Sequence, residues 1–164
     1  SEALDYEAEL AFIIGVEIRH ASAENALDAI AGYSIFNEGS IRDYQRKATQ
    51  WTPGKNFNKT GAFGPALVKT DLFPEGMCNA RIQIRLNGVT MQDSNTKNLI
   101  FPVRRLISIL SEIMTLEPGD VVVSGTPEGV GHARRPPVWM KPGDYVEVEI
   151  EGLGVLSNTV EDET

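Results

Sequence analysis

The chain of 164 residues contains one cysteine, two histidines and no hydrophobic run that approaches the ~20 residues needed to cross a bilayer. With Cys78 alone, no intramolecular disulfide and no cysteine-based zinc motif can form, which fits a reducing compartment. Positive charge is also scarce, since 15 Lys and Arg stand against 23 Asp and Glu, for a formal net charge of −8. Such a chain has no overall field that attracts nucleic acid or an anionic membrane. We therefore expect a cytoplasmic protein with neither of these partners.

The composition is that of an ordinary globular protein, with 41% hydrophobic and 23% charged residues. This length corresponds to about one domain and is enough to bury a sizeable core. Because no linker, repeat or low-complexity tract divides the chain, residues 1–164 are expected to form a single domain. The chain opens on an acidic segment without Met, directly on a strand-like pattern. We therefore expect a domain truncated on its N-terminal side.

Short strand patterns dominate the chain. An apolar run over 10–15 and a run over 33–38 predict buried strands, and residues 81–86 alternate ahead of an Asn87-Gly88 hairpin turn. Further strands are predicted over 121–124 and 145–151.

Helical patterns are fewer. One helix is predicted from Ser22 as N-cap to Gly32 as its stop, and a longer one from Pro102 to Met114, where apolar residues keep helical spacing. Residues 39–65 are rich in turn-forming residues and predict a long ordered loop with a short helix near 42–45. The predicted class is α+β, mainly β.

Two carboxylates, Glu7 and Glu9, lie on the first predicted strand. Side chains two residues apart share a face, with Cβ atoms roughly 6.6 Å apart. The pair can therefore place one oxygen each on a cation between them, and without a cation the two charges would repel. The spacing alone leaves two interpretations open, half of a metal site or a solvated strand face such as the one that alternate glutamates form over 147–151.

Glu38 ends the next predicted strand and would reach the same ion if the two strands are neighbours. Three carboxylates without histidine or cysteine favour Mg²⁺, Mn²⁺ or Ca²⁺ over zinc. Arg42 and Gln45 share one helical face, and Lys55 follows in the loop. A guanidinium, an amide and an ammonium suit an anionic substrate, although each residue taken singly is also compatible with an ordinary surface position.

Eight motifs follow one another across the chain. In order, they are LDYEAELA (4–11), GYxxxNExxxRDxQ (32–45), GKNF (54–57), GAFGP (61–65), NGxxxQxxNT (87–96), LEPGD (116–120), SGTPEGVG (124–131) and KPGD (141–144). Together they resemble the fumarylacetoacetate hydrolase family over nearly the whole chain. The resemblance implies a catalytic domain built as a β-roll or sandwich with flanking helices, and a homodimer.

The resemblance also assigns residues. It implies a metal site for Mg²⁺, with Mn²⁺ and Ca²⁺ as alternatives, on Glu7, Glu9 and Glu38, where many members carry Asp in place of Glu38. It implies a catalytic role for Lys55 and a substrate shell that consists of Arg42, Gln45, Lys55 and Thr126. The family usually supplies a His-x-x-Glu base pair from a lid segment upstream of the first strand. That pair is not in this chain, and neither His20 nor His132 replaces it by motif.

The function that the resemblance implies is a divalent-metal-dependent hydrolase of carbon–carbon bonds. It would act on acylpyruvates, 1,3-diketo acids or 2-oxo acids, in aromatic catabolism, through a metal-bound enolate. The same site would serve a decarboxylase, isomerase or hydratase of unsaturated 2-oxo dicarboxylic acids. The alternative outside enzymes is a metal- or ligand-binding relic without the lid base.

Two further expectations concern turnover and assembly. Since the base lies upstream, we expect this chain alone to turn over poorly. Val138, Trp139 and Met140 are candidates for a dimer contact or for packing at the edge of the core.

Overall fold

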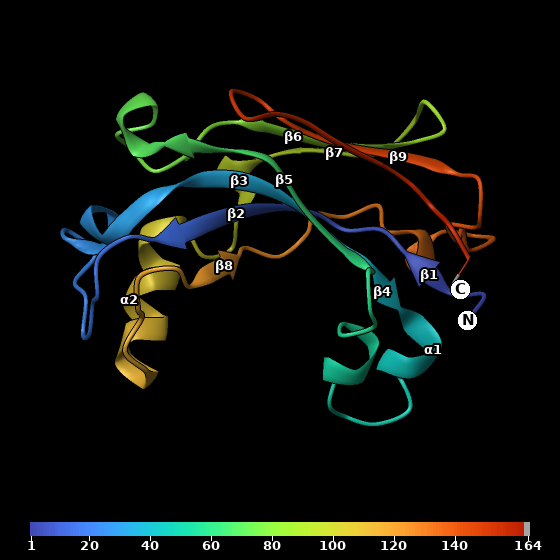
Figure 1. The fold of residues 1–164 in the computed structure, drawn as a ribbon, viewed down its shortest axis with the longest axis horizontal. Coiled ribbons are helices and arrows are strands. Elements are labelled where there is room, and N and C mark those ends of the chain that lie inside the picture. Colours follow the sequence, from blue (N-terminus) through green and yellow to red (C-terminus); the bar gives the residue numbers. More distant parts are fainter. Residues whose placement is uncertain (163–164) are drawn as a thin grey trace.

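The computed structural model describes residues 1–162, and its elements form two stacked antiparallel sheets (Figure 1). The first sheet has the order β5-β3-β2-β8 and the second the order β10-β9-β6-β7, while β1 and β4 form a separate two-stranded ladder. The strands are β1 (Leu4–Asp5), β2 (Ala8–Ile14), β3 (Ile30–Glu38), β4 (Ser40–Ile41), β5 (Gly61–Lys69), β6 (Arg81–Leu86), β7 (Val89–Asn95), β8 (Val121–Val123), β9 (Tyr145–Ile150) and β10 (Gly154–Thr159). The α-helices are α1 (Arg42–Gln45) and α2 (Val103–Ile113). The predicted class, α+β and mainly β, is confirmed.

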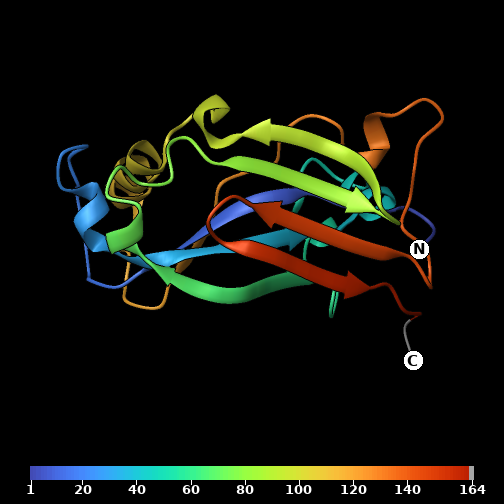
Figure 2. The same ribbon diagram turned by 90° about the horizontal axis from the view of Figure 1, so that it is seen from above.

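The core lies between the two sheets, and Figure 2 shows the second sheet lying over the first. Successive side chains of a strand point to opposite faces of a sheet. The alternate residues that fill the core are Ala8, Leu10 and Phe12 of β2, Ile82, Ile84 and Leu86 of β6, and Val146, Val148 and Ile150 of β9. Burying each large one stabilises the fold by about 1.5–3 kcal/mol. Because Leu10 points into the core, its neighbour Glu9 points to the outer face of the first sheet.

The helix predicted over 22–32 is wrong. Only a short 3₁₀ turn forms, over Ala26–Ala29, and β3 begins immediately after it at Ile30. Gly32, expected as a helix stop, lies inside β3 opposite Lys69 of β5. A Cβ at Gly32 would meet Leu67 Cδ1 at 2.7 Å and the carbonyl oxygen of Val68 at 2.6 Å. The glycine therefore permits close pairing of two strands.

The predicted loop over 39–65 is too long at its C-terminal end, because β5 begins at Gly61. The segment contains Gly61, Gly64 and Pro65, which in sequence indicate a loop. In the structure β5 is an edge strand whose pairing with β3 is interrupted by a bulge near Gly64, a setting in which strands tolerate proline.

Other local predictions hold. The short helix α1 forms at Arg42–Gln45, α2 follows Pro102, and Asn87 and Gly88 take φ values of 51° and 78° in the hairpin between β6 and β7. No helix within residues 1–162 is long and apolar enough to cross a membrane.

Candidate metal centre and substrate site

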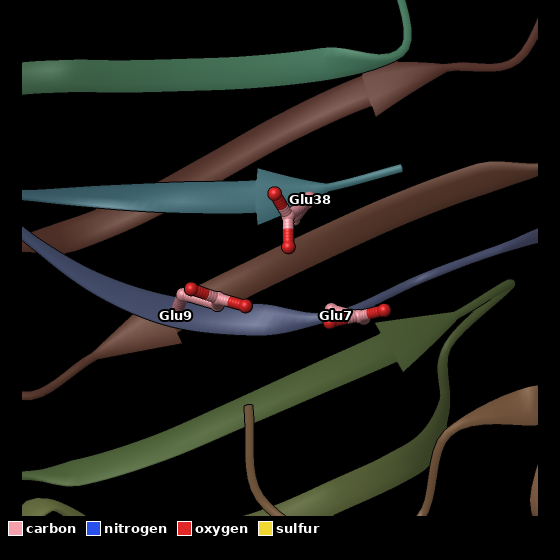
Figure 3. Close-up of side chains that lie close together, drawn as sticks. All are labelled: Glu7, Glu9 and Glu38. Carbon is pink, nitrogen blue, oxygen red and sulfur yellow. The ribbon is translucent and has the colours of Figure 1, made fainter. Parts of the chain in front are cut away.

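Glu7, Glu9 and Glu38 converge at one end of the paired strands β2 and β3 (Figure 3). The pairing places Glu9 opposite Phe36, and the Glu38 N–H donates to the Glu7 carbonyl at 3.0 Å. One carboxylate oxygen from each residue lies within 4.8 Å of the others. Two oxygens that share a Mg²⁺ or Ca²⁺ at about 2.0–2.6 Å lie at most about 4–5.2 Å apart, so these residues fit a hard divalent cation.

The carboxylates are crowded and largely buried, with Glu7 and Glu9 only 5% and 2% exposed. Burial raises the pKa of Glu9 to about 8, and the charges of Glu38 and Glu7 add to the rise against a hydrogen bond from the Gly125 N–H. The site therefore gathers more negative charge than its own hydrogen bonds offset, which a bound cation would relieve.

Lys55 provides positive charge inside this cluster. Its Nζ lies 2.6 Å from Glu38 Oε2 and 2.9 Å from Glu7 Oε1. Burial lowers the pKa of the Lys55 ammonium, but the hydrogen bonds to Glu38 and Glu7 and the negative charges of these two carboxylates together raise the pKa above its ordinary value. Lys55 is therefore charged at neutral pH and touches two of the three carboxylates.

Arg42, at the start of α1, contacts the same oxygen of Glu7 as Lys55 does. Its Nη2 contacts Glu7 Oε1 at 2.8 Å, its Nη1 donates to Gln45 Oε1 at 3.0 Å, and its Nε donates to Asp5 Oδ2 at 2.8 Å. Arg42, Gln45 and Lys55, predicted as substrate residues, are thus brought together beside the carboxylates.

Thr126, the fourth predicted substrate residue, lies in the turn that follows β8. Its neighbour Gly125 donates its N–H to Glu9 Oε2 at 2.9 Å, so the turn abuts the carboxylates. Thr126 Oγ1 accepts a hydrogen bond from Gln92 Nε2 at 2.9 Å. A cavity of about 490 Å³ opens between this turn and the segment 94–101, and Thr126 and Phe101 are among its lining residues.

Three polar residues of the site were not predicted. Ser40 donates to Glu7 Oε1 at 2.6 Å, Gln92 holds the turn at Thr126, and Asp5 holds Arg42. A signal for Asp5 was present, because it continues the alternation of Glu7 and Glu9 by one step towards the N-terminus. Ser40 and Gln92 carry no such signal, since their contacts join distant parts of the chain.

The two histidines and the segment 138–140, a candidate for a dimer contact, differ in their surroundings. His20 is exposed, whereas the His132 ring contacts Arg46 and stacks on Trp139 with ring centroids 5.9 Å apart. Burial and the charges of Arg46 and Arg42 lower the pKa of His132. Met140 is buried in the core, so of the two interpretations offered for it, core packing applies.

Two stacked sheets that present three carboxylates, a lysine and an arginine at the end of paired strands define a protein with a candidate metal centre and an adjacent anion-binding shell. The family model described as fumarylacetoacetate (FAA) hydrolase C-terminal matches residues 1–161, and the chain belongs to this family. The fumarylacetoacetate hydrolase from psychrophilic Exiguobacterium antarcticum has a similar structure, with a TM-score of 0.96 and 41% identity over 99% of this chain and 58% of that one. The family fold expected from the motifs is thus confirmed.

Two further similar proteins have named activities or ligands. The mitochondrial oxaloacetate tautomerase fahd2 of Xenopus laevis is 44% identical over 162 residues, which are 98% of this chain and 50% of that protein. A structure of fumarylpyruvate hydrolase from Pseudomonas aeruginosa in complex with Mn²⁺ and pyruvate has a TM-score of 0.87 and 32% identity, over 98% of this chain and 66% of that one. The chain thus spans about half the length of the Xenopus protein.

Proposed function

We propose that this protein is a divalent-metal-dependent enzyme that acts on 2-oxo or 1,3-diketo acids by stabilising an enolate. The observation that carries the proposal is the convergence of three carboxylates with Lys55 and Arg42 on the outer face of the first sheet. Enolate charge develops as the transition state forms, so fixed positive groups at that point lower the barrier instead of merely tightening binding.

Glu7, Glu9 and Glu38 would hold the ion. Their all-carboxylate donor set favours Mg²⁺, with Mn²⁺ and Ca²⁺ as alternatives, and the Mn²⁺ in the Pseudomonas structure supports a divalent ion in this family. When bound, such an ion is a Lewis acid towards the oxygens of a 2-oxo acid.

The protein's own residues would bind and orient the substrate. The Lys55 ammonium would balance the negative charge that develops on the enolate oxygen, since its pKa keeps it protonated. Arg42 and Gln45 would orient the substrate's oxygens from one side. On the other side, the Thr126 hydroxyl or its N–H would hold a terminal carboxylate.

For the reaction itself we propose hydrolysis of a carbon–carbon bond in an acylpyruvate, which consumes water and releases pyruvate and a second carboxylic acid. A base that activates the water would come from the segment upstream of β1. A second candidate is keto–enol tautomerisation of oxaloacetate, which the 44% identity with the Xenopus tautomerase favours. Tautomerisation needs only a proton transfer and no water.

To test the proposal, the full-length protein is assayed with an acylpyruvate and with oxaloacetate as substrates. Each assay is run with added Mn²⁺ or Mg²⁺ and again after treatment with EDTA. We expect metal-dependent turnover of one of the two substrates, and its loss in Glu7→Gln. Glu17→Gln, an exposed carboxylate just beyond β2, is the matched control and should keep wild-type rates. Turnover that survives EDTA, or the absence of turnover of both substrates, would contradict the proposal.

For the assembly we propose a homodimer, as the motifs imply. Sedimentation velocity of the full-length protein tests this, and a monomer at all concentrations would contradict it.

A further inference from the structure

Asp5 is a fully buried carboxylate whose two oxygens accept hydrogen bonds from three segments of the chain. Oδ1 accepts from the N–H of Tyr6 at 2.9 Å and of Gly131 at 2.7 Å. Oδ2 accepts from the N–H of His132 at 2.9 Å and from Arg42 Nε at 2.8 Å. Every donor but one is backbone, and the exception is an arginine that also touches Glu7.

We propose that Asp5 is a positioning residue that fixes the orientation of the Arg42 guanidinium towards the substrate. The inference rests on the proposed function, in which Arg42 orients the substrate's oxygens. Helix α1 has only four residues and no side-chain cap, so its own hydrogen bonds are too few to fix where Arg42 points. The guanidinium is planar, so a bond at Nε to a buried acceptor sets the plane of the whole group.

The number of N–H groups on Arg42 shows how many remain free for a substrate in this orientation. A guanidinium has five N–H groups, of which Asp5, Gln45 and Glu7 each accept one. One N–H on each of Nη1 and Nη2 remains, so two donors on adjacent nitrogens are left for a carboxylate or a 2-oxo acid. A rotated guanidinium would aim that pair elsewhere.

Asp5 also links Arg42 to the loop that follows the Thr126 turn. The loop that carries Gly131 and His132 follows the Thr126 turn, so one carboxylate holds both Arg42 and the chain segment beyond the turn. A Cβ at Gly131 would collide with the Val138 carbonyl and would lie 2.8 Å from Asp5 Oδ1. Only glycine allows the loop to pass this close to Asp5.

The test is a double-mutant cycle that measures pyruvate binding to the Mn²⁺-loaded, full-length protein by calorimetry. In Asp5→Asn an NH₂ group replaces one oxygen and faces N–H donors, so we expect pyruvate affinity to fall by about ten- to a hundredfold, the loss typical of a hydrogen bond between charged groups. In the Arg42→Ala background, Asp5→Asn should cause little further loss, because the residue it positions is gone. Equal losses in both backgrounds would overturn the inference.

A matched control and a second variant keep the cycle informative. Asp144 is also buried and accepts hydrogen bonds from the Lys141 N–H and from Asn87, away from the site. Asp144→Asn should lower the melting temperature but leave pyruvate affinity unchanged. If Asp5→Asn does not fold, Arg42→Lys keeps the charge without the planar fork and should bind pyruvate as weakly as Arg42→Ala, whereas wild-type affinity in Arg42→Lys would overturn the inference.

The outcomes separate the two proposals. A wild-type protein that binds Mn²⁺ but not pyruvate contradicts the proposed function. A wild-type protein that binds pyruvate while Asp5→Asn binds it equally well contradicts only the role of Asp5.

Discussion

Single residues at the site have properties that follow from crowding. Glu9 lies among two other carboxylates, and burial is the main reason why its pKa stands near 8 in the metal-free protein. Lys55 offsets part of the charge through Glu7 and Glu38. Without a metal ion, the negative charge of the three carboxylates is thus only partly balanced. The free energy of unfolding of the metal-free protein must therefore depend on pH.

The sign of that dependence follows from the direction of the shift. The pKa of Glu9 is raised from 4.5 to about 8, so between these values the folded protein holds a proton that the unfolded chain has released. The stability that this proton confers is present below about pH 4.5 and is lost as the pH rises through 8. We expect the free energy of unfolding in urea, with EDTA, to fall between pH 5 and pH 8.5 by more in the wild type than in Glu9→Gln.

Glu17→Gln is the control for this measurement, because Glu17 is exposed on the same segment of chain. It should show the wild-type slope. An identical slope in Glu9→Gln and the wild type would mean that Glu9 is ionised throughout the range.

At the scale of elements, Gln92 of β7 connects the two sheets at the site. Its Oε1 accepts the N–H of Ala8, which lies between Glu7 and Glu9, and its Nε2 donates to Thr126 Oγ1 and to the Pro127 carbonyl. Gln92 is 1% exposed. One buried amide therefore sets the distance between the strand that carries the carboxylates and the turn that carries Thr126.

Replacing this amide tests the connection. Gln92→Met keeps the length of the side chain but leaves the buried Ala8 N–H without an acceptor, so we expect a loss of about 1–3 kcal/mol in the free energy of unfolding. Because Thr126 also loses its donor, pyruvate affinity should fall. Thr90→Val, at an exposed position of the same strand, should change neither quantity by much. Unchanged stability in Gln92→Met would show that water satisfies the Ala8 N–H.

The elements that the sequence predicted well are those with local causes. The alternation in β6 and β9, the Asn87-Gly88 turn and the apolar spacing of α2 all act within a few residues. The 22–32 helix was wrong and β5 was missed because the pairing of β3 with β5 decides the structure from Ile30 onward and from Gly61 onward, and that pairing joins residues about 30 apart. The glycines and the proline within these segments instead indicated the end of a helix at Gly32 and a loop over 61–65.

At the candidate site, too, features with local causes were predictable and features with long-range causes were not. The spacing of Glu7 and Glu9 left a metal site and a solvated strand face open, whereas the family resemblance implied a cation shared with Glu38. The structure brings the oxygens of all three together. The alternation with Glu7 and Glu9 signalled Asp5 but not its contact with Arg42, which is 37 residues away in sequence. The support that Gln92 gives was not predictable, because its partners Ala8 and Thr126 lie more than 30 residues away. Motif order could locate the candidate substrate residues, but not the residues that hold them in place.

At the scale of the whole molecule, the apolar core and the candidate metal centre lie on opposite faces of the first sheet. The apolar core lies between the sheets, whereas the carboxylates lie on the outer face of the first sheet. Replacing one of these buried carboxylates by the amide of the same size therefore leaves the apolar core unchanged and removes like-charge repulsion.

Metal-linked stability tests this separation. An ion at 100 times its Kd should add ~2.7 kcal/mol to the free energy of unfolding of the wild type. The double variant of Glu7→Gln and Glu9→Gln should show no increment with Mg²⁺ or Mn²⁺, yet it should be folded without metal. Differential scanning fluorimetry with and without each ion measures both effects, and an increment retained in the double variant would place the ion elsewhere.

The pairing of β2 with β3 has a consequence for how the chain can vary in length. A residue inserted into the exposed turn over 22–25 would enlarge a surface connection and leave Glu9 opposite Phe36. A residue inserted within β3 just before Glu38 would instead swing that side chain through the sheet into the apolar interior. An insertion is thus tolerated in the turn between β2 and β3, whereas an insertion within either strand disrupts the carboxylate cluster. Homologues of different length should therefore differ in the turns and not within these two strands.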